Sequence, residues 1–179
     1  NEHLNNGSCT FNTALAKGVF ELYKPKTILE FGCGVGYYCN YWSSCEGVQT
    51  VHGIEPNIMD QTMFSSSNCK QMCFNITKDD DSEFEFLDEY DLVISIEVAE
   101  HIDRKYHDKL FNFLTKKSKN IIVFSGARLN QPGHGHIACR SEEDWRSEFL
   151  KRNKVFDTVD TNILRNEKSN IRNINHVKN

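Results

Sequence analysis

The sequence predicts an α/β fold in which a doubly wound, mostly parallel seven-stranded sheet carries an antiparallel edge strand. Short apolar runs typical of buried strands alternate with stretches of helical spacing, and this alternation is typical of a parallel sheet covered on both faces. The first apolar run ends in a glycine-rich turn, Gly32-Cys33-Gly34-Val35-Gly36. A strand that enters a glycine turn and then a helix brings backbone N–H groups close to a nucleotide-like ligand.

Helix and strand are expected to alternate through the first part of the chain. Leu15, Val19 and Leu22 recur at helical spacing and predict an opening helix. The strands are short apolar runs, and Pro56 closes the second of them. The expected elements, in order, are a helix at 11–23, a strand at 27–31, a helix from the glycine turn to about Ser43, a strand at 51–55, a helix from Asn57 and a strand near 72–76.

The alternation is expected to continue after an acidic stretch at 78–91, which predicts a loop with one turn. Ser141 predicts a helix N-cap, because the acidic residues that follow it favour the positive end of a helix. The Asn-rich tail, 155–179, predicts two antiparallel strands at the edge of the sheet. The other expected elements are a strand at 91–95, a helix at 102–117, a strand at 121–124 and the helix that Ser141 caps, to Lys151.

The length and composition bound the class of protein. At 179 residues the chain can bury one core, so we expect a single domain over 1–179, and the start at Asn1 favours a domain excised from a longer chain. No stretch has the pattern of a membrane span or a signal peptide. The seven cysteines form no C-x-x-C pair, which argues against a disulfide framework and favours a reducing, cytoplasmic location.

Charge is spread unevenly along the chain. Residues 1–103 hold 5 Lys/Arg and 17 Asp/Glu, whereas residues 104–179 hold 16 and 8. A basic second half can face a polyanion. We favour the alternative, that these are solvated charges on helices and loops.

The glycine turn and two carboxylates predict a cationic nucleoside as the ligand. A dinucleotide pattern, G-x-G-x-x-G, would need a glycine where Tyr37 stands. Glu30 lies two residues ahead of the turn, where an acid would repel a pyrophosphate but suits a cation. Glu55 ends the second strand and can accept both ribose hydroxyls, although an exposed acid at a strand end is the alternative interpretation.

The pattern from Glu30 to Gly36, E-x-G-x-G-x-G, resembles motif I of the class I S-adenosylmethionine (SAM)-dependent methyltransferases. The segment YDLVISIEVAEHI at 90–102 is similar to the part of that family that follows its fourth strand. The resemblance spans about residues 26–150 and implies a Rossmann-like fold with S-adenosyl-L-methionine as cofactor. It implies these cofactor-binding residues, among which Asn75 stands where the family usually has an acid: Glu30, Gly32, Gly34, Gly36, Glu55, Asn75, Ile76 and Ser95.

Acids and histidines cluster after two of the predicted strands. Glu97, Glu100 and His101 are spaced i, i+3 and i+4, so they share one face if a helix begins there. Such groups repel one another unless a proton or a cation lies between them. His134 and His136 follow in a glycine-rich loop that opens on the same edge of the sheet. The alternative interpretation is a Glu-His pair that braces the helix.

This combination resembles the metal-dependent 2′-O-methyltransferases of small-RNA 3′ ends, and its E-x-x-E-H part also resembles the ubiquinone-pathway O-methyltransferases. The resemblance implies that a divalent cation, Mg²⁺ or Mn²⁺ with Zn²⁺ or Fe²⁺ as alternatives, is held by Glu97, Glu100, His101 and His136. Such an ion orients a vicinal diol and lowers the pKa of its hydroxyl. We expect His134 and His101 to be catalytic, with His134 as the general base; a simple loop histidine is the alternative for His134.

The expected function is methyl transfer to a hydroxyl of a vicinal diol on a sugar or glycan, in a protein without membrane contacts and fused to other glycan-synthesis domains. The alternatives are a 2′-O-methyltransferase of the 3′-terminal ribose of RNA and a non-catalytic scaffold. The acidic first half disfavours RNA, as does the lack of aromatic residues interleaved with basic ones. A scaffold would have little reason to keep the carboxylates and histidines together.

Overall fold

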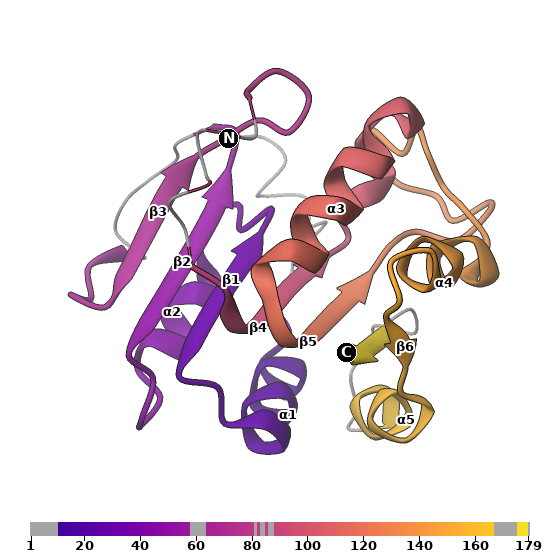
Figure 1. Ribbon diagram of the computed structural model, residues 1–179. Helices are drawn as coiled ribbons and strands as arrows, with labels where there is room; N and C mark the ends of the chain where they lie inside the picture. The colour runs from indigo at the N-terminus through magenta and orange to yellow at the C-terminus, as the bar shows by residue number, and fades with distance from the viewer. Residues whose placement is uncertain are drawn as a thin grey trace.

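The computed structural model describes residues 11–57, 64–80, 82, 85, 88–166 and 175–178. A central sheet is covered by helices on both faces (Figure 1). The helices are α1 (Thr13–Tyr23), α2 (Tyr37–Ser43), α3 (His107–Lys117), α4 (Glu142–Leu150) and α5 (Thr158–Asn166), with short 3-10 turns η4 (Ala99–His101) and η5 (Arg104–Tyr106). The strands are β1 (Thr27–Phe31), β2 (Thr50–Glu55), β3 (Cys69–Cys73), β4 (Tyr90–Ile96), β5 (Ser118–Ser125), β6 (Val155–Phe156) and β7 (Asn175–Lys178).

The sheet is mostly parallel, and its order creates a switch point. Strands β3, β2, β1, β4 and β5 are neighbours in that order and run parallel. From β1 the chain continues to β2 on one side, whereas β4 pairs with β1 on the other side. Ligands of open α/β sheets bind where the strand order reverses, at the carboxyl ends of the strands.

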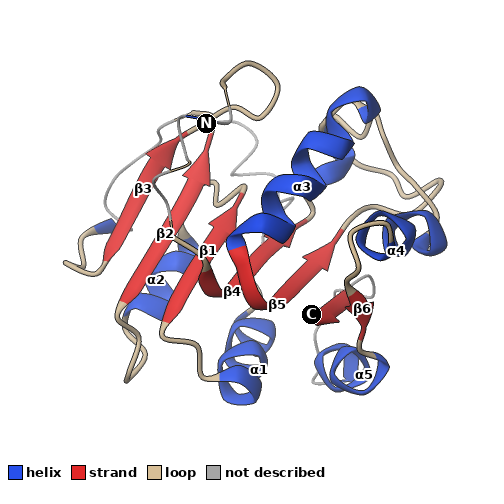
Figure 2. Ribbon diagram, viewed as in Figure 1, coloured by secondary structure: helices blue, strands red, loops and turns tan. Residues whose placement is uncertain are grey.

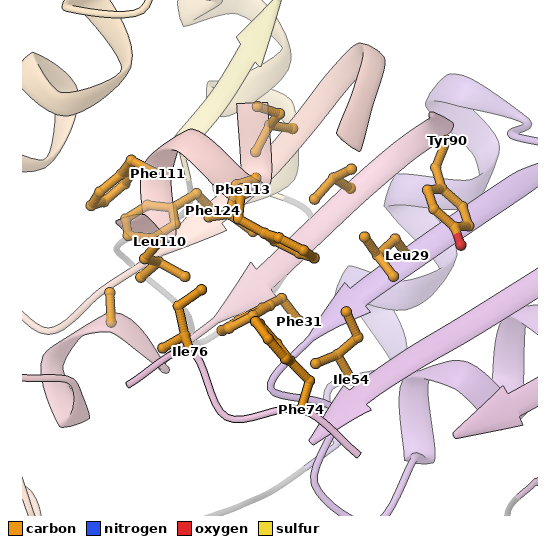
Figure 3. Packing of buried hydrophobic residues seen from close by; sticks show 14 of the residues in the cluster. Leu29, Phe31, Ile54, Phe74, Ile76, Tyr90, Leu110, Phe111, Phe113 and Phe124 are labelled. Carbon is orange, nitrogen blue, oxygen red and sulfur yellow. The ribbon is translucent and has the colours of Figure 1, made fainter. Parts of the chain in front are cut away.

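Each strand of the parallel part contributes to two separate cores, because successive side chains point to opposite faces. Leu29 and Phe31 of β1 pack with α3 and α4, whereas Ile28 packs with α1, α2 and α5. Figure 3 shows the first core, in which the ring of Phe111 packs against Phe124 and the ring of Phe113 packs against Phe31 and Phe74. Burying one such phenylalanine contributes about 2–3 kcal/mol, so this aromatic cluster fixes α3 over the sheet.

The predicted α/β fold with a mostly parallel sheet is confirmed, and its parallel part has five strands. The predicted strands at 27–31, 51–55 and 91–95 and the helix that Ser141 caps are confirmed, since Ser141 accepts the N–H of Asp144. The third strand was predicted three residues too late, because the buried residues Phe74 and Ile76 extend the apolar run beyond the end of β3. The helix predicted from Asn57 lies mainly outside the described residues.

Two predictions at the second half need correction. The helix predicted from Ile102 begins at His107, because Asp103 caps the separate turn η5 with its side chain. The tail was predicted as two antiparallel edge strands; β6 and β7 do pair antiparallel at this side of the sheet, but helix α5 lies between them in the chain. The strand that runs antiparallel is β7, which lies between β5 and β6 rather than at the edge. No helix among the described residues is long and apolar enough to cross a membrane.

Candidate active site

The predicted site residues gather at the edge of the sheet that is formed by the carboxyl ends of its parallel strands. Strands β1, β2, β4 and β5 all end at this edge, and the glycine turn, η4 and the loop from β5 to α4 follow directly (Figure 2). Figure 1 shows that α3 starts beside this edge and runs back across the sheet. The edge therefore brings together the glycine turn after β1, the carboxylate that ends β2, and an acid–histidine cluster after β4 and β5.

The glycine turn is tied to the end of β2. Gly32 and Cys33 both donate their N–H groups to the carbonyl oxygen of Ile54, at 2.8 and 3.0 Å. Gly34 donates its N–H to Glu55 Oε2 at 3.1 Å. Burial raises the pKa of Glu55 above its ordinary value. The carboxylate predicted to accept the ribose hydroxyls thus lies beside the turn, held by one of its N–H groups.

Glu30 is buried beneath the glycine turn. The thiol of Cys39, on α2, donates to Glu30 Oε2 at 2.9 Å. Burial raises the pKa of the Glu30 carboxyl to about 8, above its ordinary value of 4.5. A cationic ligand at the turn would favour the ionised form, which is the electrostatic role predicted for this acid.

Replacing Glu30 by glutamine is expected to reduce the loss of stability that the cofactor-free protein undergoes as pH rises. The folded chain keeps a proton on Glu30 up to a pKa of about 8, whereas the unfolded chain releases it near 4.5. The free energy of unfolding therefore falls between these pH values by a few kcal/mol, since each pKa unit corresponds to about 1.4 kcal/mol. Urea unfolding of both proteins across this range measures the effect, and equal slopes for the two would contradict it.

Three other residues predicted to bind the cofactor are buried or engaged in local hydrogen bonds. Asn75 Oδ1 accepts hydrogen bonds from the N–H and the hydroxyl of Thr77, which closes a local turn. Ile76 is buried in the core beside Phe74. Ser95 is fully buried at the end of β4, and its hydroxyl has no partner among the described residues. Their contacts with a cofactor stay predictions.

Glu100 is the least compensated polar group at this edge. Its side chain is 0% exposed, and neither carboxylate oxygen has a hydrogen-bond partner among the described residues. Burial and the nearby Glu97 raise the pKa of Glu100 to about 8. Its carbonyl oxygen accepts the N–H groups of Ile137 and Ala138 at 2.9 and 3.0 Å, which docks the histidine loop onto η4. A buried, unpartnered carboxylate is costly unless a cation or a proton satisfies it.

Two imidazoles converge on Glu100. Atoms of Glu100, His101 and His136 able to ligate a metal lie within 4.8 Å of one another, and His136 Nε2 is 3.9 Å from Glu100 Oε1. The Nδ1 atoms of His101 and His136 are each 3.1 Å from a carbonyl oxygen, those of Gly135 and Gln131. A carbonyl accepts, so each Nδ1 carries the proton and each Nε2 is left as the possible ligand.

Glu97 lies next to this cluster but is held differently. It is in the left-handed backbone region, with φ 54°, so it stands before η4 rather than on a helix face with Glu100 and His101. Its carboxylate accepts from the Ser125 hydroxyl at 2.7 Å and from Gln131 Nε2 at 3.0 Å. The expectation that these three residues share one helical face is therefore wrong.

The loop from β5 to α4 bends sharply around His134 and His136. Gly135 has φ +74°, a conformation that favours glycine, and a side chain at Gly133 would overlap the ring of His136. His134 is exposed and near enough to His101 to contribute to lowering its pKa, after burial and His136. The loop thus presents His134 at the surface and His136 towards Glu100.

Two residues of this site, Ser125 and Gln131, were not predicted from the sequence. Both contact the carboxylate of Glu97, from the end of β5 and from the loop that follows it. The position of Ser125 at the end of an apolar strand was a usable signal. The aromatic residues Trp42 and Trp145 are fully buried in the two cores, so their rings cannot stack against a ligand.

Comparison with known proteins agrees with this architecture. The profile of a family described as a methyltransferase domain matches residues 10–152, most of the chain. No curated protein matches the sequence. Many solved structures do match the fold.

Three of these structures illustrate the likeness, all at identities that show the fold alone. The methyltransferase domain of bacterial CtHen1 has a TM-score of 0.59 and 12% identity, over 90% of this chain and 93% of that one. The small RNA methyltransferase HEN1 gives 0.65 and 13%, over 95% of this chain and 26% of that one. The O-methyltransferase of a trans-AT PKS multienzyme of Brevibacillus brevis, in complex with S-adenosyl-L-homocysteine, gives 0.58 and 18%, over 80% and 51%.

Proposed function

The chain belongs to the class I SAM-dependent methyltransferases, and from this premise we propose that it is a divalent-metal-assisted O-methyltransferase of vicinal diols. The acceptor that we propose is a sugar or glycan. Two conditions must then be met at the edge of the sheet: a site for the methyl donor at β1 and β2, and a site that binds and activates a diol beside it.

The single observation that carries the proposal is the environment of Glu100. A fully buried carboxylate, without a hydrogen-bond partner among the residues that the structure describes, faces two imidazoles whose Nδ1 protons are engaged by backbone carbonyls. Mixed carboxylate and imidazole ligands suit Mg²⁺, Mn²⁺, Fe²⁺ or Zn²⁺. The residues that would hold the ion are Glu100, His101 and His136, with Glu97 as a fourth ligand or as a brace that also adds negative charge.

The residues of the site divide the chemistry between them. A bound divalent cation would supply positions for both oxygens of a diol and lower the pKa of the hydroxyl that is methylated. Ser125 and Gln131 orient Glu97 beside Glu100, and the backbone carbonyls of Gly135 and Gln131 fix the orientation of the two imidazoles. His134, exposed on the same loop, is the residue proposed to accept the acceptor's proton.

The methyl donor would occupy the cradle formed by the glycine turn. Glu55 would accept the ribose hydroxyls, and the negative charge of Glu30 would favour a sulfonium and ammonium cation at the turn. The open space at Gly34, where an added Cβ would meet nothing within 4 Å, leaves room for a ligand to approach the backbone. Methyl transfer also needs this cradle and the diol site to be adjacent, and β1 and β4 are direct neighbours.

The distribution of charge supports a sugar over RNA as acceptor. The densest basic cluster, Lys116, Lys117 and Lys119, lies at the end of α3 and the start of β5, which is the opposite edge of the sheet from Glu100. Lys119 is also paired with Asp91 at 3.5 Å. These lysines therefore do not favour a phosphate backbone at the site. RNA is the second candidate, since a 3′-terminal ribose offers the same diol and HEN1 has a similar fold.

The proposal is tested by methyl transfer to matched acceptors. We expect the full chain with SAM and Mn²⁺ to methylate a methyl glycoside that carries a vicinal diol, but not its deoxy analogue that lacks one of the two hydroxyls, and we expect EDTA to stop the reaction. Formation of S-adenosylhomocysteine and the mass of the product measure it. Transfer only to RNA with an intact 3′-terminal ribose would replace the sugar by RNA, and transfer that is indifferent to EDTA would contradict the metal.

A further inference from the structure

A buried histidine outside the cluster of proposed ligands contacts both ends of the turn that carries Glu100 and His101. His107, the first residue of α3, is 2% exposed. Its Nε2 lies 3.0 Å from the carbonyl oxygen of Ala99 and 2.9 Å from that of Ile102. These two carbonyls stand immediately before Glu100 and immediately after His101, so one imidazole N–H holds both ends of the ligand-bearing segment.

The tautomer of His107 follows from its partners. Carbonyl oxygens only accept, so Nε2 must carry the proton. On the other side of the ring, Nδ1 lies 3.2 Å from Arg140 Nη1, and a guanidinium only donates. Nδ1 is therefore the acceptor. Burial lowers the pKa of His107, which agrees with a neutral ring that has the Nε2–H form.

Arg140 connects this imidazole to the histidine loop. Arg140 lies in the same loop as His136, and its backbone N–H donates to the carbonyl oxygen of Ala127 at 3.2 Å. Its guanidinium is fixed by Glu148 Oε1 at 3.0 Å and stacks over the ring of Trp145 at 5.2 Å. Both segments that carry ligand residues, η4 and the loop after β5, are thus anchored to one buried relay, Glu148–Arg140–His107.

We propose that His107 is the positioning residue of the metal site. Together with Arg140 it holds Glu100, His101 and His136 in the relative positions that a cation requires. This inference rests on the proposed function, since it concerns the same cation. Among the described residues, the polar contacts of His107 are with the carbonyl oxygens of Ala99 and Ile102 and with Arg140. It acts through the backbone at Ala99 and Ile102, because the direction of the Glu100 and His101 side chains depends on the shape of that turn.

The test compares Mn²⁺ affinity with SAM affinity in the full chain, by calorimetry, for His107→Phe and His107→Gln. Phenylalanine keeps the bulk of the ring but has no N–H donor and no acceptor, so we expect Mn²⁺ affinity to fall about 10–100-fold, as for other groups that orient metal ligands. We expect SAM affinity to change less than about twofold, because the glycine turn lies outside the relay. Glutamine keeps a donor and an acceptor and is expected to recover part of the Mn²⁺ affinity.

His52 provides the matched control. It is a half-buried histidine on β2 that contacts the hydroxyl of Tyr90 at 2.6 Å, away from the relay. His52→Phe should leave Mn²⁺ affinity unchanged. The inference would be overturned if His107→Phe bound Mn²⁺ as tightly as the wild type does, or if it lost Mn²⁺ and SAM affinity equally. Absence of Mn²⁺ binding by the wild-type protein would instead refute the proposed function.

A second measurement needs no variant and covers the case in which His107→Phe does not fold. Nitrogen-15 NMR of the histidine rings in the wild-type protein reports which ring nitrogen carries the proton. We expect His107 to be a neutral Nε2–H imidazole and to keep this form when Mn²⁺ is replaced by diamagnetic Mg²⁺ or removed. An Nδ1–H tautomer would contradict the hydrogen bonds that define the relay, and with them the inference.

Discussion

Replacing Glu100 by glutamine is expected to abolish methyl transfer while SAM still binds. The amide keeps the size of the side chain but has no negative charge for a cation. Because even groups that only orient a ligand cost about 10–100-fold in metal affinity, loss of a ligand should reduce turnover at saturating SAM by at least about 100-fold. The measurement is production of S-adenosylhomocysteine with the diol acceptor, together with calorimetric titration of SAM.

The folding of this variant separates a functional effect from a structural one. Glu100 is buried and has no hydrogen-bond partner in the described part of the chain, and its pKa is raised to about 8, so removal of the carboxylate should leave the free energy of unfolding unchanged or increase it. Asp103→Asn is the matched control, since it removes a charge of the same sign two residues after His101 from an exposed carboxylate. Full turnover in Glu100→Gln, or equal losses in both variants, would contradict the role of Glu100.

Replacing Gly32 by alanine is expected to reduce stability strongly. Gly32 has φ +78°, and an added Cβ would lie 2.9 Å from Val98 Cγ1 and closer still to its Cγ2. The left-handed conformation costs about 1–2 kcal/mol for a residue with a side chain, and the overlap adds about 1–3 kcal/mol. The free energy of unfolding should therefore fall by about 2–5 kcal/mol, and the affinity for SAM should fall with it because the turn is displaced.

Two other glycines separate the cost of the left-handed conformation from the cost of the overlap. Gly47 has φ +87° and open space around an added Cβ, so Gly47→Ala measures the conformational cost alone. Gly34 has φ +52° and equally open space, but it lies in the proposed cofactor cradle. Gly34→Ala should therefore lose SAM affinity with a stability loss no greater than that of Gly47→Ala. Equal stability of Gly32→Ala and Gly47→Ala in urea unfolding would show that Val98 moves aside without cost.

The parts of the fold that could be predicted are those in which local pattern and burial agree. Strands β1 and β4 are short, mainly apolar runs that are buried on both faces, so their positions followed from the local sequence pattern. Helix α5 could not be predicted, because the residues of Thr158–Asn166 are rich in β-branched side chains that favour strands. Packing of Leu164 and Thr161, both fully buried, favours a helix there, and Asp157 caps its start by accepting the N–H of Asp160.

The candidate site was also predictable only in part. The spacing of Glu100 and His101 and the histidine loop could be read from the sequence, because strand ends meet at one edge of a parallel sheet. The left-handed backbone of Glu97 could not, since nothing in the sequence marks a non-glycine residue with φ 54°. The relay from His107 to Arg140 was also invisible, because its partners are 33 residues apart in the chain.

The central claim, that Glu100 and the two histidines hold a divalent cation beside the methyl donor, is tested most directly by titrating Mn²⁺ into the SAM-loaded full chain. The experiment needs no knowledge of the acceptor. We expect binding at one site, competed by Mg²⁺ and lost in Glu100→Gln. Absence of binding, or equal binding in the wild type and the variant, would contradict it and would leave Glu100 and His136 as a buried ion pair that braces the loop.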